Sequence, residues 1–210
     1  MTDGFWKQVT IIIPYYREET QLAILLSDLR AVEDKAEIIT VSEGSRARSL
    51  NAGARRSKRR FLWFLHADSR VTADNLMKLA EAGPAFPDDL HYFELSFDRD
   101  GSFLAPLNAW GANMRSRFFG APYGDQGLFI AREHFTACNG YPEDVPYGED
   151  LLFVLRAQQA GLKLHRIPSR LLTSARKYGK HDWLRLTILY QWRWLRMAWR
   201  ERRRFAGEKT

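Results

Sequence analysis

The sequence is poor in cysteine and contains no long apolar run. Its single cysteine, Cys138, excludes an internal disulfide and fits a reducing compartment. No window approaches the roughly 18 uncharged apolar residues that a bilayer-spanning helix needs. The segment from Met1 to Gln8 lacks a basic stretch followed by an apolar one, so no secretory signal is visible. These absences predict a cytoplasmic protein.

Repeats, low-complexity segments and long linkers are also missing. With 210 residues, of which 45% are hydrophobic, the chain can bury a substantial core. We therefore predict one domain over residues 1–175, which is large enough to be a catalytic domain, followed by an extension over residues 176–210.

The positive charge of this chain is concentrated near its end. The net charge is +7, and the span from Arg176 to Arg204 alone holds ten Lys or Arg against two acids. The rest of the sequence is therefore nearly neutral. A basic segment on a neutral domain indicates an anionic partner, which is a lipid surface, a nucleic acid or a diphosphate.

Short apolar runs alternate with segments of helical periodicity. This alternation predicts an α/β fold with a Rossmann-like, mostly parallel sheet flanked by helices. The expected strands are Val9–Ile13, Ile38–Val41, Phe61–Leu65, Tyr92–Phe97 and Gly127–Ala131. The expected helices are Thr20–Val32, Ser45–Ser57, Thr72–Ala82 and Asp150–Ala160. We expect an irregular stretch from Gly101 to Gly124, where Gly, Pro and Asn recur.

The strand Phe61–Leu65 ends abruptly in His66, Ala67 and the acid Asp68. Ligands of open α/β sheets bind beyond the carboxyl ends of such buried strands. Asp68 is thus a candidate ligand for a divalent cation, or simply a cap for the next turn or helix.

Four short motifs, in this order along the chain, resemble those of family 2 glycosyltransferases of the GT-A fold. The similarity is greatest to the small bacterial branch whose metal motif reads His-Ala-Asp, and it runs from about Val9 to Trp194. The motifs are Thr10–Pro14, Leu50–Gly53, Phe64–Asp68 and Gly148–Asp150, with further similarity at Gly124–Gly127 and Thr173–Arg176.

The resemblance implies transfer of a sugar from a nucleotide-diphosphate-sugar with inversion at the anomeric carbon. Asp68 would bind Mg²⁺ or Mn²⁺, since such cations take one or two carboxylates together with phosphate oxygens. His66 is either a weak or indirect ligand of that cation or a structural residue. The other residues that the resemblance places around the donor are Pro14, Asn51 and Ala67.

The resemblance makes Asp150 the general base that deprotonates the acceptor hydroxyl. Glu149 beside it, together with Asp125 and Gln126 in a glycine-flanked turn, would contact the sugar or the acceptor. The alternatives are that Glu149 and Asp150 only complement a helix dipole, and that Asp125 only forms a turn. Arg176 would close over the diphosphate.

The chain departs from the family after its second strand, where one βα unit is missing or fused. Glu43 stands where an acid would read the nucleotide base, so we assign it to donor binding. Arg46 and Arg48 nearby either bind phosphate or belong to a solvated helix face.

Residues 182–205 have the pattern of one amphipathic helix. Its arginines fall within a stripe of about 80°, and apolar side chains, flanked by tryptophans, occupy another face. The helix either adsorbs to an anionic membrane surface or packs on the domain. The stripe comprises Arg185, Arg193, Arg196, Arg200 and Arg203, and the apolar face comprises Leu184, Ile188, Leu195 and Trp199.

The expected partners are a nucleotide-sugar donor, an acceptor that is lipid-linked if the extension meets the inner membrane surface, and that surface itself. Nucleic acid is not expected, because the extension contains no known recognition module. A non-catalytic, membrane-associated relative that has lost donor binding is the alternative.

Overall fold

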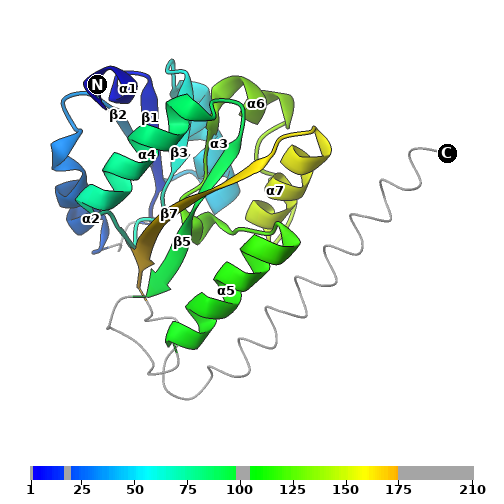
Figure 1. The fold of residues 1–210 in the computed structure, drawn as a ribbon. Coiled ribbons are helices and arrows are strands. Elements are labelled where there is room, and N and C mark those ends of the chain that lie inside the picture. The colour runs from blue at the N-terminus through cyan, green and yellow to red at the C-terminus, as the bar shows by residue number, and fades with distance from the viewer. Residues whose placement is uncertain (1, 17–19, 98–104, 175–210) are drawn as a thin grey trace.

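One mixed sheet organises the computed structural model, which describes residues 2–16, 20–97 and 105–174. Its strand order within these residues is β2-β1-β3-β6-β5-β7-β4 (Figure 1). β6 and β4 run antiparallel to their neighbours, and the remaining pairs are parallel. The predicted α/β class with a mostly parallel sheet is confirmed. The strands are β1 (Val9–Pro14), β2 (Glu37–Val41), β3 (Phe61–Phe64), β4 (Ser69–Arg70), β5 (Leu90–Phe97), β6 (Phe129–Ala131) and β7 (Leu164–Thr173).

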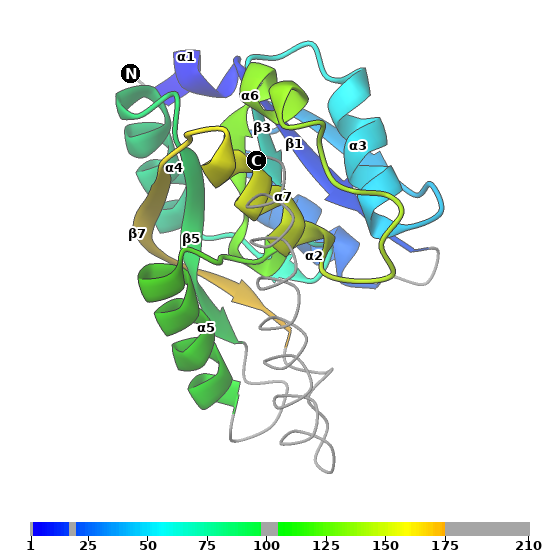
Figure 2. The same ribbon diagram turned by 90° about the vertical axis from the view of Figure 1, so that its right-hand side faces the viewer.

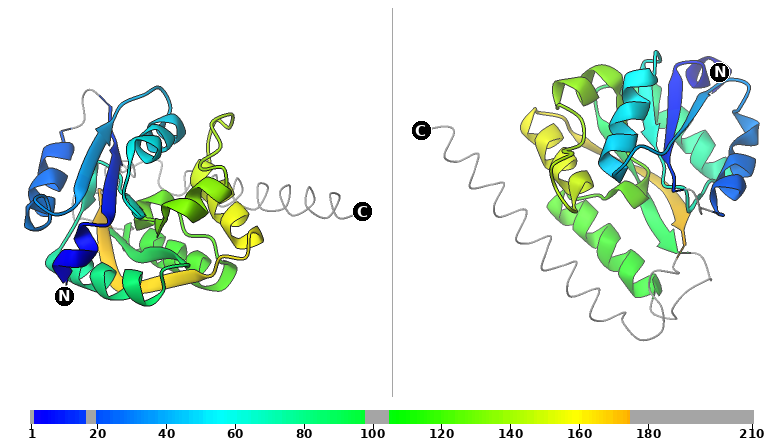
Figure 3. Two further views of the ribbon diagram at one scale, coloured as in Figure 1. Left: turned by 90° about the horizontal axis from the view of Figure 1, so that it is seen from above. Right: turned by 180° about the vertical axis from the view of Figure 1, so that it is seen from behind.

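Helices cover both faces of the sheet (Figure 3). One apolar cluster joins the sheet to α1, α2 and α4, and a second joins it to α3, α6 and α7. The helical elements are α1 (Thr2–Trp6), α2 (Leu22–Asp28), η1 (Leu29–Ala31), α3 (Arg46–Arg56), α4 (Ala73–Ala85), α5 (Ala105–Phe119), η2 (Gly124–Gln126), α6 (Arg132–Ala137) and α7 (Glu149–Gln159).

The central strands are apolar throughout because both of their faces are buried. Ile11 and Ile13 of β1 belong to one apolar cluster, and Ile12 between them belongs to the other. On the Ile12 face, α3 approaches β1 so closely that a Cβ on Gly53 would lie 2.4 Å from Ile12 Cγ2. Glycine at position 53 therefore allows this helix to pack directly on the strand.

The carboxyl ends of β1, β2 and β3 meet at one edge of the sheet. Pro14 of β1 pairs with Val41 of β2, and Ile12 pairs with Phe64 at the end of β3. Because β6 is antiparallel to β3, the turn before β6 reaches this same edge. We call it the carboxyl edge.

The helix α5 lies within the stretch expected to be irregular. Pro106 is tolerated in its first turn, and Asn113 attaches it to β5. The Leu95 N–H donates to Asn113 Oδ1 over 2.8 Å, and Asn113 Nδ2 donates to the Leu95 carbonyl over 3.0 Å. Helix α5 lies along β5 (Figure 2). Its tertiary contacts with that strand thus offset the weak helical signal of the local sequence.

The strand β7 was not predicted from the sequence, and Pro168 explains why. A proline inside a strand usually marks an edge or a bulge. Here the pairing with β5 jumps from Phe93–Ile167 to Glu94–Arg170, so Pro168 falls in a bulge. The structure also adds β4, α1 and α6, which were not expected. The predicted helix over 182–205 lies outside the described residues.

Candidate active site

Three loops bring polar side chains to the carboxyl edge. His66 and Asp68 follow β3, Asp125 lies in η2 before β6, and Glu149 with Asp150 opens α7. His66 and Asp68 are partly buried, whereas Glu149 and Asp150 are almost fully buried. The rigid sheet therefore supports residues that are far apart in the sequence.

A residue in the left-handed backbone conformation leads the chain into α7. Gly148 has a φ of 77°, a conformation that favours glycine, and it precedes the acids Glu149 and Asp150. Both acids lie in the first turn, where the helix dipole stabilises negative charge by about 0.3–1 kcal/mol. This stabilisation offsets only part of the cost of burying two adjacent carboxylates.

Arg46, the first residue of α3, supplies the compensating positive charge. Its Nε donates to Glu149 Oε1 over 2.7 Å, and its Nη2 donates to Asp150 Oδ2 over 2.7 Å. One guanidinium thus bridges both acids, and about a third (32%) of its side chain remains exposed. Arg46 is therefore accessible from solvent while it holds two buried carboxylates.

His66 completes this cluster from the opposite loop. Its Nε2 lies 3.2 Å from Nη1 of Arg46. A Cβ on Gly124 would lie 2.7 Å from His66 Nε2 and 2.7 Å from both carboxylate oxygens of Asp150. The backbone at Gly124 consequently passes between the predicted base and the loop that carries Asp68.

The electrostatics of Asp150 suit a base that works near neutral pH. Burial raises the pKa of Asp150, Arg46 and the backbone of Gly124 lower it, and Glu149 and Asp125 raise it; together these effects place the pKa at about 6. Asp150 Oδ1 is buried and has no hydrogen-bond partner among the described residues. The carboxylate therefore keeps one acceptor position for a further group, such as an acceptor hydroxyl.

The guanidinium of Arg46 stays charged in this setting. Burial by itself lowers the pKa of Arg46, but the carboxylates of Asp150 and Glu149 outweigh that effect and raise the pKa above its usual range. Arg46 therefore keeps its positive charge between the carboxylates of Glu149 and Asp150.

Tyr141 also borders this cluster. Its ring is buried, and its hydroxyl has no hydrogen-bond partner in the described part of the chain. Burial raises the pKa of Tyr141 well above its ordinary value, with smaller effects from Asp150 and Arg46. A neutral hydroxyl without a partner beside two charged groups is a candidate ligand contact that the sequence did not suggest.

Gln126 was predicted to contact the sugar or acceptor, and the structure places its side chain inside the protein. Its Oε1 accepts from Ser116 Oγ over 2.7 Å and from the Tyr123 N–H over 3.2 Å, and its Nε2 donates to the Phe93 carbonyl over 3.0 Å. This amide fixes the η2 turn and so the position of Asp125. A direct contact of Gln126 with a ligand would require this turn to open.

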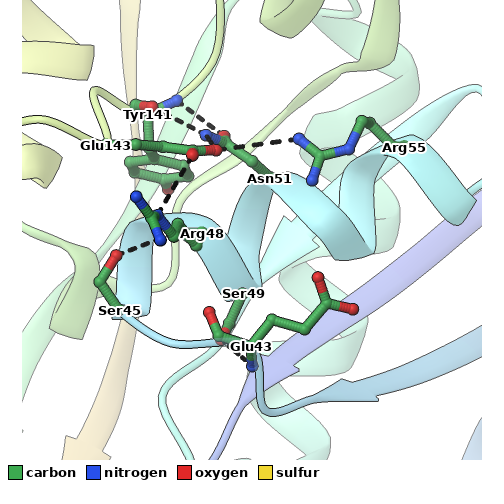
Figure 4. A network of polar contacts seen from close by, with 8 residues as sticks. All are labelled: Glu43, Ser45, Arg48, Ser49, Asn51, Arg55, Tyr141 and Glu143. Carbon is green, nitrogen blue, oxygen red and sulfur yellow. Dashed lines mark hydrogen bonds and ion pairs between the residues drawn. The ribbon is translucent and has the colours of Figure 1, made fainter.

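Asn51, predicted at the donor site, clamps a neighbouring loop (Figure 4). Its Nδ2 donates to the Tyr141 carbonyl and to Glu143 Oε1, each over 2.8 Å, and its Oδ1 accepts from the Tyr141 N–H over 2.9 Å. Asn51 therefore positions Tyr141 relative to α3, and its role toward a donor stays a prediction.

Glu43, the expected base-reading acid, lies in the link between β2 and α3. Its carboxylate is about half exposed and forms an ion pair with Arg56, and its backbone N–H donates to Ser49 Oγ over 2.8 Å. The link runs directly from β2 to α3, as the shortened pattern in the sequence suggests. Pro14 and Ala67 are buried beside the same edge and offer no side-chain polar group.

A group of side chains that could hold a metal ion lies away from this site. Among the described residues, the ligand atoms of Asp88, Glu133 and His134 lie within 4.8 Å of one another. Asp88 precedes β5, whereas Asp68 follows β3, and these two strands run in the same direction. This cluster is therefore at the opposite edge of the sheet from Asp150.

The sequence left the role of Arg46 open, although one signal was available. Arg46 and Arg48 lie in the first turn of α3, where positive charge opposes the helix dipole. Ser45 caps this helix by accepting from the Arg48 N–H over 3.3 Å. A basic first turn with no acid in it indicates that the charge serves another contact. Arg176 lies outside the described residues.

No helix within residues 2–16, 20–97 and 105–174 combines the length and hydropathy needed to cross a membrane.

Solved glycosyltransferase structures share this fold. The mannosyltransferase PcManGT from Pyrobaculum calidifontis, in complex with GDP-Man and Mn²⁺, matches with a TM-score of 0.60 and 17% identity over 84% of this chain. S. aureus TarS 1–349 in complex with UDP-GlcNAc matches with a TM-score of 0.59 and 14% identity over 83% of this chain. The matches cover 59% and 60% of those chains, so this chain spans less than two thirds of their length.

Comparison at the level of sequence is less informative. A scan against models of protein families gives no match, and a search of curated proteins gives none. The structural matches, at identities below one fifth, establish that the chain has the fold of GT-A-type glycosyltransferases.

Proposed function

We propose that this chain is a metal-dependent, inverting glycosyltransferase of the family 2 type, acting on a nucleotide-diphosphate-sugar at a membrane surface. The observation that carries the proposal is the buried Asp150, held by Arg46 beside His66 at the carboxyl edge of a GT-A-type sheet. Perturbed carboxylates in such a position are typical of active sites. The GDP-Man and UDP-GlcNAc complexes of the two structural relatives support the donor class.

Asp150 acts as the general base in this proposal. It takes the proton of the acceptor hydroxyl, and the acceptor oxygen forms a bond to the anomeric carbon. The bond from that carbon to the diphosphate oxygen breaks, and the nucleoside diphosphate leaves with the electron pair. A single displacement of this kind inverts the anomeric centre.

Arg46 has two roles in succession. In the structure its guanidinium donates a hydrogen bond to Asp150 Oδ2 and so forms an ion pair with that buried carboxylate. When a diphosphate enters, its negative charge competes for the same guanidinium, since arginine binds phosphate through paired N–H groups. Movement of Arg46 toward the diphosphate then releases Asp150 for the acceptor and raises its basicity. Arg176 is proposed as a further diphosphate contact.

The chemistry of the residues after β3 fits a bound Mg²⁺ or Mn²⁺. Asp68 offers a partly buried carboxylate, and hard cations in such sites need only one or two carboxylates besides phosphate oxygens and water. The cation would supply charge stabilisation for the departing diphosphate. Asp68 would hold it, His66 would orient the loop, and Asp125 and Glu149 would face the sugar and acceptor.

The second candidate is a membrane-associated protein with the same fold that no longer binds a donor. The specific observation in its favour is the short link between β2 and α3, in which Glu43 is paired with Arg56. A nucleotide base would compete with Arg56 for the carboxylate of Glu43.

Calorimetry with the full chain separates the two candidates. We expect a nucleoside diphosphate or its sugar, from a panel of bases, to bind in the presence of Mn²⁺. Asp68→Asn should weaken this binding about ten-fold or more, because a metal ligand is lost. Asp88→Asn, in the cluster at the opposite edge, is the matched control and should leave it unchanged.

Two outcomes would go against the assignment. Absence of binding for every nucleotide with and without metal favours the non-catalytic candidate. If Asp88→Asn loses nucleotide binding and Asp68→Asn retains it, the metal site must be assigned to the cluster of Asp88, Glu133 and His134.

A further inference from the structure

The outer face of α5 carries large apolar side chains that remain exposed. Leu107 is 53% exposed, Trp110 61% and Phe118 69%. At 100° per residue these three, with the partly buried Met114 between them, lie within about 80° of one another. We call this stripe the α5 face.

The α5 face differs from the other exposed apolar positions. Among the described residues, Ile24 on α2 and Met77 on α4 are the single exposed large apolar side chains of their helices. Scattered apolar residues are ordinary at a protein surface, whereas several on one helix face mark an interaction site. Figure 2 shows α5 along β5 at the outer side of the described fold.

The one exposed charge on α5 is positive. Helix α5 contains no acid, and the exposed Arg117 lies over the ring of Phe118 at 5.9 Å. The basic segment from Arg176 to Arg204 begins just after Thr173, which pairs with Phe97 at the end of the strand that precedes α5. A helix with bulky apolar side chains, tryptophan and basic residues suits the interface of an anionic bilayer.

The inner face of α5 is attached to the candidate active site. Arg115 Nε donates to the Ala121 carbonyl over 3.0 Å, and its guanidinium stacks on the Tyr123 ring at 3.6 Å. Ser116 Oγ donates to Gln126 Oε1 over 2.7 Å in the η2 turn that carries Asp125. One helix thus presents an apolar surface outward and supports the predicted acceptor turn inward.

We propose that the α5 face docks on an anionic lipid bilayer and places the carboxyl edge at the water–lipid boundary. An acceptor hydroxyl that reaches Asp150 from this side then belongs to a lipid-anchored molecule. The acceptor class rests on the proposed function, whereas the docking surface does not.

A fluorescent label tests the contact directly. Cys138 is buried, so a thiol-reactive environment-sensitive dye will label a cysteine introduced at Trp110 in the full chain. We expect a blue shift with vesicles that contain phosphatidylserine, and quenching by brominated lipids. The same label at Met77, on α4, should change in neither respect. A label at position 110 that stays unchanged with vesicles overturns the proposal.

The same labelled protein also tests whether another part of this chain, and not a bilayer, covers the α5 face. If residues 182–205 of this chain already cover it, the label at position 110 will report an apolar environment without vesicles. That result also overturns the proposal.

Charge substitutions provide the second readout. Trp110→Glu with Phe118→Glu should weaken partitioning of the full chain into anionic vesicles about ten-fold or more, since two buried apolar groups are lost. Ile24→Glu with Met77→Glu is the matched control and should partition like the parent. Equal partitioning of all three proteins contradicts docking through α5.

Donor binding, measured by calorimetry on the same variants, should be unaffected. If no protein binds a donor while the label at position 110 still reports insertion into vesicles, the proposed transferase function fails and the docking surface remains.

Discussion

Arg46 and Asp150 depend on each other at the candidate site. Asp150 is buried and its pKa is raised to about 6, and the 2.7 Å contact with Arg46 is what allows it to remain ionised at neutral pH. Arg46 in turn bridges Glu149 and contacts His66. The residues proposed for catalysis are therefore electrostatically coupled, and substitution of one should change the titration of another.

Substitution of Arg46 tests this coupling through the pH dependence of transfer. A base acts only when deprotonated, so kcat/KM should fall as the pH decreases through about 6, the pKa of Asp150. Arg46→Met removes a positive charge, which raises the pKa of Asp150 and moves this acidic limb to higher pH. At neutral pH we also expect about a hundred-fold lower kcat/KM.

Arg46→Lys is the matched control, because it keeps the charge and loses the planar fork. Its acidic limb should stay closer to that of the parent protein. A limb that does not move in Arg46→Met would show that Asp150 is not the group that titrates.

At this scale the sequence was partly informative. His66, Glu149 and Asp150 were singled out by resemblance to known motifs, and the structure brings all three to one cluster. Arg46 was left ambiguous because its carboxylate partners, Glu149 and Asp150, lie 103 and 104 residues away, and no local pattern encodes such a contact. The burial of Gln126 was likewise decided by Ser116 and Phe93 on other elements.

Among the elements, η2 controls the spacing between the loops of the site. The backbone at Gly124 passes between His66 and Asp150, and a methyl group there would lie 2.7 Å from both. Gly124→Ala should therefore displace the base and lower kcat about a hundred-fold, as misplacement of about 1 Å can do. Steady-state kinetics and thermal unfolding of the purified variant measure both effects.

Gly111→Ala on α5 is the matched control for this substitution. A Cβ at Gly111 meets nothing within 4 Å, and alanine in a helix is more stable than glycine by about 0.5–1 kcal/mol. This variant should unfold at a slightly higher temperature with unchanged kcat. Equal activity of Gly124→Ala and the parent would mean that η2 does not shape the site.

The elements that the sequence predicted are those whose signals are local. Strands β1, β2 and β3 correspond to short apolar runs in the sequence. The predicted helix Thr72–Ala82 corresponds to α4, which Thr72 caps by accepting from the Asn75 N–H over 3.3 Å. Helix α5 and strand β7 lack such signals, because Asn113 and the bulge at Pro168 depend on partners in β5.

On the scale of the whole molecule, the fold and the charge distribution support different parts of the proposal. The GT-A-type sheet and its carboxyl edge support the transfer chemistry, whereas the basic extension and the α5 face support a lipid surface. The predicted cytoplasmic location, the boundary at residue 175 and the helix over 182–205 stay predictions, because the structure of the described residues tests none of them.

The measurement that tests the central claim most directly is release of nucleoside diphosphate by the full chain with Mn²⁺ and a donor that it binds, with water as the acceptor hydroxyl. We predict that Asp150→Asn lowers this rate about 10²–10⁴-fold while donor affinity stays near that of the parent, because the base acts on the acceptor and not on donor binding. An Asp150→Asn protein that releases the nucleotide as fast as the parent would contradict the assignment of this carboxylate as the catalytic base.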